Sequence, residues 1–335
     1  MLETVTSIPP LNKILEPIAH QLDEMEALIE DIIQSKEELM SEVVNHVRDF
    51  RGKRLRPALV LLAGNCSWAS DKKNQKDLIA LAAITELIHT CTLIHDDIID
   101  KADTRRNSES FNKKWDNNVA VIFGDYLFSK AFSMTVQLED PILRQRLAEV
   151  ISDLCEGEMM QLHGRNASFM NEDFYHNMIL LKTATFLGCC TGMGSRLSGA
   201  NGEETEKMDR AGELLGCAFQ IVDDCLDLMG DESVMGKSLG TDLSTGKFTL
   251  PLIKLLAYLS SEEIVEIKKL FSAGQGHLAK GKILAKVQET DVIDQAWEDA
   301  NKCTEEALGI FENLEDSSSK QSLIQLAQYL IYRAH

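Results

Sequence analysis

Three aspartates in the stretch 84–106, ITELIHTCTLIHDDIIDKADTRR, have a spacing that suits metal binding. Asp96 and Asp100 are four residues apart, and Asp97 stands beside them. The stretch contains no Gly or Pro before its end, and its apolar residues recur at helical spacing, so it is predicted to form a helix. Carboxylates at positions i and i+4 share one face and offer oxygen ligands to a hard cation, Mg²⁺ above all. A helix cap or a solvated acidic turn would give the same short pattern, so this cluster alone leaves both interpretations open.

The rest of this helix favours the metal interpretation. At about 100° per residue, one polar stripe within roughly ±40° holds Thr85, His89, Thr92, Asp96 and Asp100. The other faces are mostly Ile, Leu, Ala and Cys, and a helix that is apolar nearly all round is predicted to be buried. Because unpaired charges are costly in a core, the stripe is expected to face a polar cavity.

A second acidic cluster lies far along the chain, in the apolar segment FQIVDDCLD at 219–227. Gln220, Asp223 and Asp227 share one helical face there, and Asp224 is the neighbour of Asp223. Two DDxxD clusters on two apolar helices predict one metal site held from both sides.

Composition limits the kind of protein. The 335 residues carry 34 basic against 53 acidic side chains, a net charge of −19, which argues against nucleic acid as a general partner. Hydrophobic residues make up 44%, there are only 6 prolines, and almost nothing argues for strands, so we expect an all-α fold. We expect no transmembrane segment and no signal peptide. The 8 cysteines are scattered without a CxxC pattern, which indicates reduced thiols and a cytoplasmic location.

Basic residues stand in a few local groups. The segment RGKRLRP (51–57) precedes an apolar run, and Pro57 suits the start of a helix, so an anion site at a helix end is predicted. A solubilising basic loop is the alternative. Arg105 and Arg106 follow the first acidic cluster and could bind phosphate bidentately. Lys182 stands alone in the apolar run MILLKTATFL, either facing an anion or snorkelling to the surface.

Two further segments complete the pattern. The loop GKSLGTDLSTGK (236–247) is small, polar and contains Lys237 and Lys247, so it could close over phosphate. Residues 8–40 begin with two prolines and continue with an apolar helical period. We expect the N-terminal helix in 1–35 to contribute to packing against a second subunit.

Seven motifs in order resemble the trans-isoprenyl diphosphate synthases along most of the chain. They are GKRLRP (52–57), LIHDDIID with the downstream RR (93–106), GDYL (124–127), EGEMMQL (156–162), KTA (182–184), FQIVDDCLD (219–227) and GKSLGTDLSTGKFTLP (236–251). The resemblance implies one domain over 1–335, a single large helical bundle around a central cavity, the isoprenoid synthase type I fold. It also implies a homodimer and bound Mg²⁺.

The resemblance assigns roles to the motif residues. The metal would be bound by Asp96, Asp100 and Asp223, and supported or completed by Asp97, Asp224 and Asp227. An allylic diphosphate such as farnesyl diphosphate would be held by Arg105, Lys182, Thr183, Gln220 and Lys247, with Lys237 nearby. Isopentenyl diphosphate would be held by Lys53, Arg56, His89 and Arg106. Of these, Asp96, Asp100, Arg105, Lys182 and Asp223 are the expected catalytic residues, and His95, off the polar stripe, is expected to be structural.

The implied reaction is ionisation of the allylic diphosphate, condensation with isopentenyl diphosphate and loss of a proton. The expected product is an all-trans polyprenyl diphosphate. Two departures concern the loop after the paired arginines: Asn107 to Phe111 replaces a Gly and Pro-Thr pattern, and Trp115-Asp116 replaces the usual Trp-Gly. They leave substrate affinity and loop closure open.

Small residues before the first cluster predict a long product. Cys91 and Thr92 lie about 6–7.5 Å below Asp96 along the helix, where an aromatic residue closes the pocket of short-chain relatives. Deeper candidates for the floor of the pocket are Ile88, Ile84, Phe128 and Phe132. An octaprenyl-like length is the favoured prediction, with a geranylgeranyl or farnesyl diphosphate synthase as the alternative.

Three other kinds of protein share part of this pattern. A class I terpene cyclase would carry a different second metal motif and would lack GKRLRP. A non-catalytic partner subunit would have lost acidic residues that this chain keeps. A membrane-surface protein built on amphipathic helices would explain neither acidic cluster.

Overall fold

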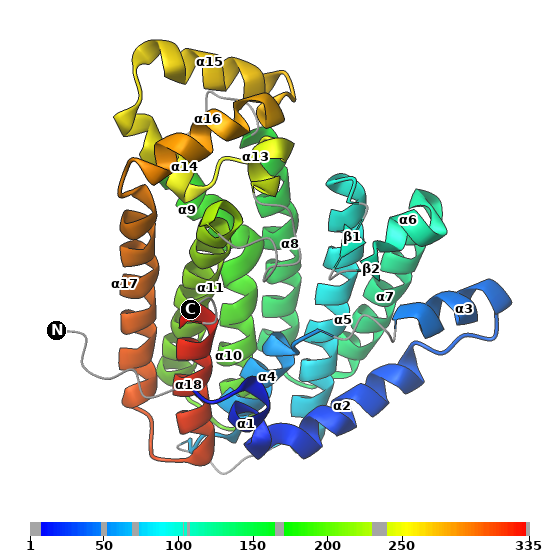
Figure 1. Ribbon diagram of the computed structural model, residues 1–335. Helices are drawn as coiled ribbons and strands as arrows, with labels where there is room; N and C mark the ends of the chain where they lie inside the picture. The colour runs from blue at the N-terminus through cyan, green and yellow to red at the C-terminus, as the bar shows by residue number, and fades with distance from the viewer. Residues whose placement is uncertain are drawn as a thin grey trace. The chain divides into compact units, whose positions relative to one another are not determined.

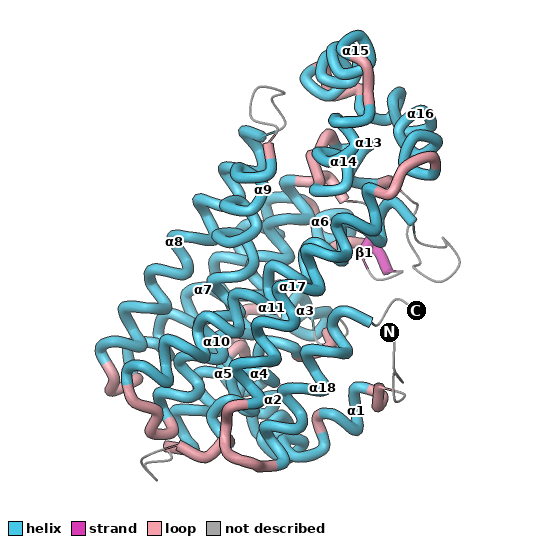
Figure 2. The backbone as a smooth tube through the Cα atoms, turned by 90° about the vertical axis from the view of Figure 1, so that its left-hand side faces the viewer, coloured by secondary structure: helices cyan, strands magenta, loops and turns pink. Residues whose placement is uncertain are grey.

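The computed structural model describes residues 8–47, 52–68, 74–102, 104–105, 108–164, 171–229 and 240–332. These residues are almost entirely helical (Figure 2). The exception is one antiparallel pair of two-residue strands, β1 (Thr104–Arg105) and β2 (Ser108–Glu109), in which Thr104 lies opposite Glu109. The predicted all-α fold is confirmed.

The chain forms two compact units, each made of several segments. Unit 1 comprises 1–148, 189–209 and 311–326, and unit 2 comprises 149–188, 210–310 and 327–335. The expectation of one domain over 1–335 stays a prediction. Each unit is described separately below.

The helices are labelled in Figure 1. Those wholly in unit 1 are α1 (Leu11–Ile14), η1 (Glu16–Ile18), α2 (Ala19–Ile32), α3 (Glu38–Val47), α4 (Leu55–Asn65), α5 (Gln75–Ile99), α6 (Phe111–Trp115) and α7 (Asn117–Gln137). Those wholly in unit 2 are α9 (Glu172–Ile179), η4 (Leu180–Ala184), α13 (Thr241–Thr245), α14 (Leu250–Leu255), η5 (Leu256–Tyr258), α15 (Ser261–Ser272) and α16 (Gly276–Gln288). Residues of both units are found in α8 (Pro141–Gly164), α10 (Thr185–Leu197), α11 (Gly202–Met229), α17 (Val292–Glu312) and α18 (Ser318–Tyr332).

Helix α5 is the centre of unit 1. It packs against α7, α4 and α2, and Figure 1 shows α7 running beside it. Its first turn is capped by Asn74, whose side chain accepts a hydrogen bond from the Asp77 amide at 3.2 Å. The sequence predicted a buried helix here, and its middle section, Leu81 to Ile88, is buried throughout. The acidic cluster therefore sits on the last turn of a helix that is fixed on several sides.

The N-terminal segment packs inside unit 1. Ile14, Ile18 and Met25 are fully buried, and α2 contacts both α4 and α5. The apolar face expected in this segment is thus covered by its own chain. Its contribution to packing against a second subunit stays a prediction.

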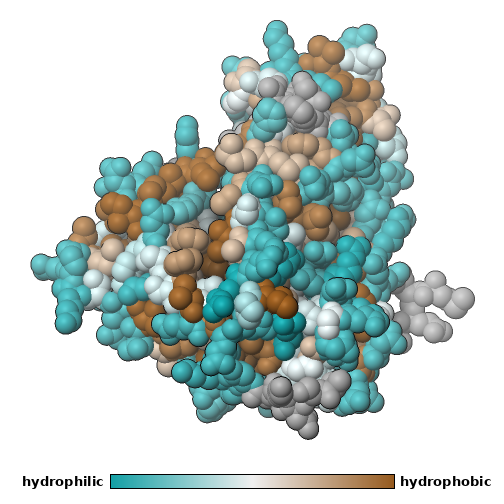
Figure 3. Space-filling model, turned by 180° about the vertical axis from the view of Figure 1, so that it is seen from behind, coloured by the Kyte–Doolittle hydropathy of each residue, from teal (hydrophilic) through white to brown (hydrophobic). Residues whose placement is uncertain are grey.

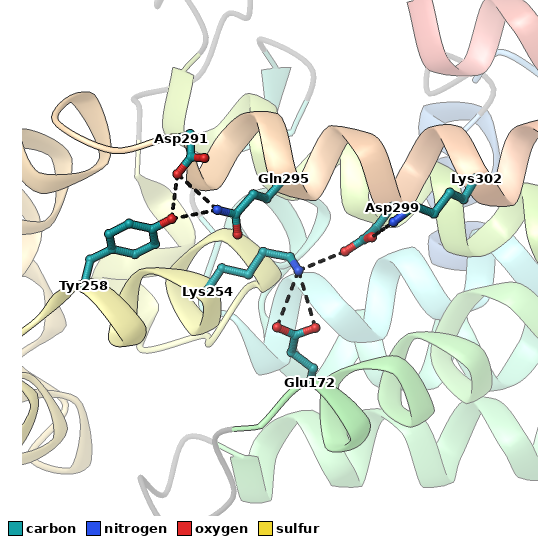
Figure 4. A network of polar contacts seen from close by, with 7 residues as sticks. All are labelled: Glu172, Lys254, Tyr258, Asp291, Gln295, Asp299 and Lys302. Carbon is teal, nitrogen blue, oxygen red and sulfur yellow. Dashed lines mark hydrogen bonds and ion pairs between the residues drawn. The ribbon is translucent and has the colours of Figure 1, made fainter.

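Unit 2 is held together by an apolar core and by a polar network at its surface. The core includes Tyr175, Phe271 and residues of α11, α14 and α17. At the surface, the Lys254 ammonium on α14 lies 3.4 Å from the Glu172 carboxylate on α9 and 2.9 Å from Asp299 on α17 (Figure 4). These contacts join three helices that are far apart in sequence.

Two helices combine length with apolar composition. By these criteria alone α5 and α7 could cross a membrane, and 61% of the most apolar window of α5 is buried within the protein, against 33% for α7. The absence of a transmembrane segment stays a prediction. The face of the molecule in Figure 3 is mostly hydrophilic, with apolar groups interspersed.

Candidate active site

The first acidic cluster occupies the C-terminal turn of α5. Asp96 and Asp100 are half-buried, Asp97 is only 2% exposed, and Asp100 caps the helix by donating its amide to the Asp96 carbonyl at 2.8 Å. The C-terminal end of a helix carries a partial negative charge. Three carboxylates at this end are therefore destabilised by that charge and by one another. A bound cation relieves both effects, which makes this turn suited to a divalent metal ion.

The basic turn lies at the start of α4 in the same unit. Lys53 is exposed and Arg56 is half-buried. Burial lowers the pKa of Arg56, although Cys190, Glu86 and Asp96 act to raise it. The Arg56 guanidinium is therefore close enough to the first acidic cluster to feel its charge. An anion held by Arg56 would lie in the field of the first acidic cluster.

The two histidines of α5 have different surroundings. His89 is half-buried, and its carbonyl accepts a hydrogen bond from the Thr92 hydroxyl at 2.8 Å. His95 instead packs against α7 at Gly124. A Cβ atom on Gly124 would lie only 2.2 Å from His95 Nε2, so a larger residue would clash with the histidine. That nitrogen is 3.8 Å from the Asp125 carboxylate. The Gly-Asp pair of the GDYL motif thus accommodates His95, in keeping with its expected structural role.

The residues predicted to set product length differ in burial. Ile88 and Cys91 are buried, and the Cys91 sulfur lies 3.8 Å from His95 Nδ1 on the side of α5 that faces α7. Thr92 and Phe128 are half-buried. Phe132 is 61% exposed and lies outside the buried face of α7. The roles of these residues in setting product length stay a prediction.

The second acidic cluster occupies the C-terminal part of α11 in unit 2. Asp223 is exposed, Asp227 is half-buried and Asp224 is only 5% exposed. Asp227 is anchored to the start of α13, because its carboxylate accepts a hydrogen bond from the Asp242 amide at 3.1 Å. This cluster repeats the electrostatic situation of the first one, with carboxylates near the negative end of a helix.

Asp224 belongs to a chain of hydrogen bonds. The Tyr175 hydroxyl on α9 donates to one carboxylate oxygen at 2.6 Å, and the Gln220 amide donates to the other at 3.0 Å. Gln220 in turn accepts a hydrogen bond from the Thr183 hydroxyl at 3.2 Å. Burial, together with the nearby charge of Asp242, raises the pKa of Asp224 well above its usual value. Of the two neighbouring aspartates, Asp223 is therefore the more accessible, and Asp224 is the one held by hydrogen bonds.

Lys182 and Thr183 lie on a π-helical turn, η4, between α9 and α10. Such turns are rare and are frequent at functional sites. Two glycines leave room for this turn: a Cβ on Gly157 would lie 2.4 Å from the Lys182 amide nitrogen, and one on Gly216 would lie 2.5 Å from Ala184 Cα. The Lys182 ammonium contacts the Glu158 carboxylate and the Gln161 amide oxygen, both on α8.

Several residues of these clusters were not predicted from the sequence. Tyr175 is separated by 49 positions from the aspartate it binds, and no local pattern reveals that pairing. Asp242 lies in the predicted phosphate-closing loop and is 3.7 Å from the Lys247 ammonium. Glu158 lies in the EGEMMQL motif, and its ion pair with Lys182 becomes visible only in the structure.

Some predicted residues cannot be placed. Arg106 and Lys237 lie outside the described residues, and Arg105 is described only as part of strand β1. Within the described segments, no three His, Cys, Asp or Glu side chains approach closely enough to hold a metal ion. The fit to Mg²⁺ therefore rests on the type of donor, carboxylate oxygen, and on its position at two negative helix ends.

The departure at Asp116 has a structural explanation. This residue has φ 70° and ψ 164°, a region that favours glycine, which is what the motif usually has there. Its carboxylate accepts hydrogen bonds from the amides of Asn118 at 2.7 Å and Val119 at 3.2 Å, and so caps α7. Helix capping offsets part of the backbone strain.

Comparison with known proteins identifies the family. The polyprenyl synthetase family profile matches residues 37–288. A Rhodobacter capsulatus all-trans-nonaprenyl-diphosphate synthase (geranyl-diphosphate specific) is 35% identical over 96% of this chain and 97% of its own length. A geranylgeranyl diphosphate synthase from Methanosarcina mazei is 30% identical over 97% of this chain and 99% of its own.

A solved structure extends the match to the whole fold. The crystal structure of a Caulobacter crescentus polyprenyl synthase, complexed with calcium and isoprenyl diphosphate, aligns with a TM-score of 0.87 at 26% identity. The alignment covers 98% of this chain and 99% of that one. From its sequence and its fold, this chain is a prenyltransferase and belongs to the polyprenyl synthetase family, the trans-isoprenyl diphosphate synthases.

Proposed function

We propose that this protein is a Mg²⁺-dependent synthase that elongates an allylic diphosphate with isopentenyl diphosphate to an all-trans polyprenyl diphosphate of medium or long chain. The observation that carries the proposal is the pair of acidic helix ends, Asp96 with Asp100 on α5 and Asp223 on α11. Both clusters place carboxylates where the helix itself is negative, an arrangement that a divalent cation stabilises. The calcium and isoprenyl diphosphate bound by the Caulobacter crescentus relative support a divalent metal and a diphosphate substrate.

Two groups of residues bind the two substrates. Lys53, Arg56, His89 and Arg106 hold isopentenyl diphosphate, and Arg105, Lys182, Thr183, Gln220, Lys237 and Lys247 hold the allylic diphosphate, as the motifs imply. When bound, Mg²⁺ neutralises the diphosphate and makes it a better leaving group. The π-helical turn fixes Lys182 and Thr183 together, while the apolar sides of α5 exclude water from the reacting carbon.

A long product is supported by the small residues below the metal-binding turn. Cys91 and Thr92 place no ring at the level where a short-chain pocket would end. One helical turn of about 5.4 Å matches the length of about one isoprene unit, so a floor deeper along α5 admits further elongation. The proposal is an octaprenyl-like product. A geranylgeranyl-sized product is the second candidate, favoured by the Methanosarcina mazei relative.

A homodimer is supported by an apolar strip on α7. Ile122, Phe132 and Val136 fall within an arc of about 80° around the helix and are 61%, 61% and 58% exposed. Exposed apolar strips of this kind mark protein–protein contacts, and a second copy of the chain is the proposed partner. All eight cysteines are free thiols, which supports a reducing, cytoplasmic location.

The test is elongation by the purified protein with Mg²⁺, isopentenyl diphosphate and farnesyl diphosphate, with products sized by mass spectrometry. We expect Mg²⁺-dependent products longer than C20, with activity falling by at least about a hundredfold in the Asp96→Ala variant. An Asp23→Ala variant, which removes an exposed aspartate of unit 1 outside all seven motifs, is the control and is expected to stay active.

The other outcomes separate the alternatives. Products that stop at C20 would place the pocket floor near Cys91 and refute the long-chain proposal. Cyclised hydrocarbons would indicate a terpene cyclase. No turnover by the chain alone, restored by a second protein, would indicate a partner subunit.

A further inference from the structure

The basic turn contains an arginine that the substrate roles above do not use. Arg54 lies between Lys53 and Arg56, but its guanidinium is turned toward two carboxylates of its own chain. Its Nη2 atom donates to Glu26 Oε2 at 3.1 Å, and its Nε and Nη1 atoms contact Glu26 and Glu86. The three side chains are largely buried, with 18%, 19% and 6% of Arg54, Glu26 and Glu86 exposed. Because every nitrogen of the guanidinium has a carboxylate partner, Arg54 is poorly placed to bind a phosphate.

The Arg54 backbone is as unusual as its side chain. It has φ 54° and ψ 36°, the left-handed region, which is unfavourable for a residue other than glycine because its Cβ crowds the backbone. Its carbonyl nevertheless accepts the first hydrogen bond of α4, from the Ala58 amide at 3.0 Å. A strained residue persists when its surroundings hold it, and here the holding groups are the two carboxylates. The left-handed kink changes the chain direction between Lys53 and Arg56.

The two carboxylates come from helices that are fixed independently. Glu26 projects from α2, and Glu86 projects from the buried middle of α5, one turn before His89. Glu86 also acts on Arg56, because its charge partly offsets the lowering of the Arg56 pKa by burial. The Glu86 charge thus bears on both arginines of the turn, and α2 and α5 together fix the turn from two sides.

We infer that Arg54 is a positioning residue: bridged to Glu26 and Glu86, it locks the left-handed turn that presents Lys53 and Arg56 to isopentenyl diphosphate. Glu26, on the N-terminal helix, acts on substrate affinity only through this arginine. The inference rests on the proposed function for the identity of the substrate. It assigns to α2 a part in substrate binding that no motif of that segment indicates.

The experiment compares Arg54→Gln and Glu26→Gln with the wild-type protein. The first measurement is KM for each substrate in the elongation assay. We expect the KM for isopentenyl diphosphate to rise about tenfold in both variants, while the KM for farnesyl diphosphate and kcat stay within about twofold. Arg54→Lys keeps the charge but loses the fork that spans two carboxylates, so it should resemble Arg54→Gln.

A matched control exists in the same unit. Arg146 pairs with Asp209 through two hydrogen bonds of 3.1 and 2.9 Å, and the two side chains are 20% and 18% exposed, so this pair resembles Arg54–Glu26 in burial and geometry. Arg146→Gln should lose a similar amount of thermal stability with no change in either KM. If Arg54→Gln behaves like Arg146→Gln, the bridge is merely structural and the inference is wrong.

Two further results decide the mechanism. The Glu26→Gln/Arg54→Gln double variant should be no worse than Arg54→Gln, because the two residues act as one unit. Effects that multiply would mean that Arg54 contacts substrate directly, and would overturn the inference.

Amide hydrogen exchange of residues 52–58 gives a measurement independent of activity. It should be faster in both single variants than in the wild-type protein and in Arg146→Gln. Unchanged exchange would refute the locking role. If the wild-type protein does not elongate any substrate, the proposed function fails, and this measurement still decides whether Arg54 holds the turn.

Discussion

At the scale of single residues, the acidic motifs are not uniform sets of ligands. In the second cluster, Asp223 is exposed, whereas Asp224 is buried and accepts hydrogen bonds from Tyr175 and Gln220. Spacing alone cannot distinguish these two neighbours, because consecutive helical residues point about 100° apart and only packing decides which one is enclosed. The DDxxD pattern thus identified the cluster, and the fold shows which of the two neighbouring aspartates is enclosed and which is exposed.

This division of roles predicts the behaviour of a Tyr175→Phe variant. Removing the hydroxyl leaves a buried Asp224 oxygen without its donor, at a cost of about 1–3 kcal/mol in the free energy of unfolding. The loosened carboxylate should also raise the Mg²⁺ concentration needed for half-maximal activity several-fold. The measurements are urea unfolding and Mg²⁺ titration of the elongation rate.

The control for this variant is Tyr126→Phe. The Tyr126 hydroxyl donates to the carbonyls of Ile33 and Gln34, both at 3.1 Å, and touches no acidic cluster. It should lower stability without changing the Mg²⁺ requirement. An unaltered Mg²⁺ titration in Tyr175→Phe would show that the hydroxyl does not support the metal-binding turn.

At the scale of elements, unit 2 depends on charges that join separate helices. Lys254 on α14 bridges α9 and α17 and is only 12% exposed (Figure 4). Burial by itself would raise the pKa of Asp299, but hydrogen bonds from Lys254 and Lys302 outweigh it and lower the pKa. A carboxylate with a lowered pKa adds stability above its unfolded pKa of about 3.9, and this stability is lost as the pH falls through the folded value.

A Lys254→Met variant should therefore be less stable than the wild-type protein near neutral pH, and the difference in the free energy of unfolding should become smaller in acid. At pH 6 we expect it to unfold more easily than the wild-type protein by about 1 kcal/mol, the usual size of one hydrogen bond. Below about pH 4 the difference should shrink, because Asp299 becomes protonated in both proteins. Urea unfolding at pH 6 and pH 3.5 measures this. Lys302→Met, which removes the more exposed partner of Asp299, should have a smaller effect, and a pH-independent difference for Lys254→Met would exclude Asp299 as its cause.

Sequence patterns predicted elements better than the connections between them. The buried α5 and the acidic end of α11 follow from apolar periodicity and from two short motifs, both of which are local. The Tyr175–Asp224 pair depends on packing between elements that are distant in sequence, so no local pattern predicts it. Asp116 shows the reverse case: the sequence showed only a departure from the usual glycine, and the structure shows that its side chain caps α7.

At the scale of the whole molecule, the strip of Ile122, Phe132 and Val136 on α7 predicts self-association. A Val136→Lys variant places a charge in the strip and should weaken dimerisation at least about tenfold, as measured by size-exclusion chromatography with light scattering. Val265→Lys, at a residue of α15 that is 66% exposed in unit 2, is the control and should leave the dimer intact. A wild-type protein that is monomeric at all concentrations would refute the homodimer.

The π-helical turn has a consequence for how this chain can change in evolution. The helix that runs through α9, η4 and α10 spans 172–197, and its π turn holds about one residue more than an α-helical turn. Deleting one residue from 180–184 would restore a regular helix and rotate the residues on one side by about 100° relative to the other. Tyr175 would then point away from Asp224 while Thr183 kept its place beside Gln220, or the reverse. The length of this segment is therefore constrained independently of its side chains.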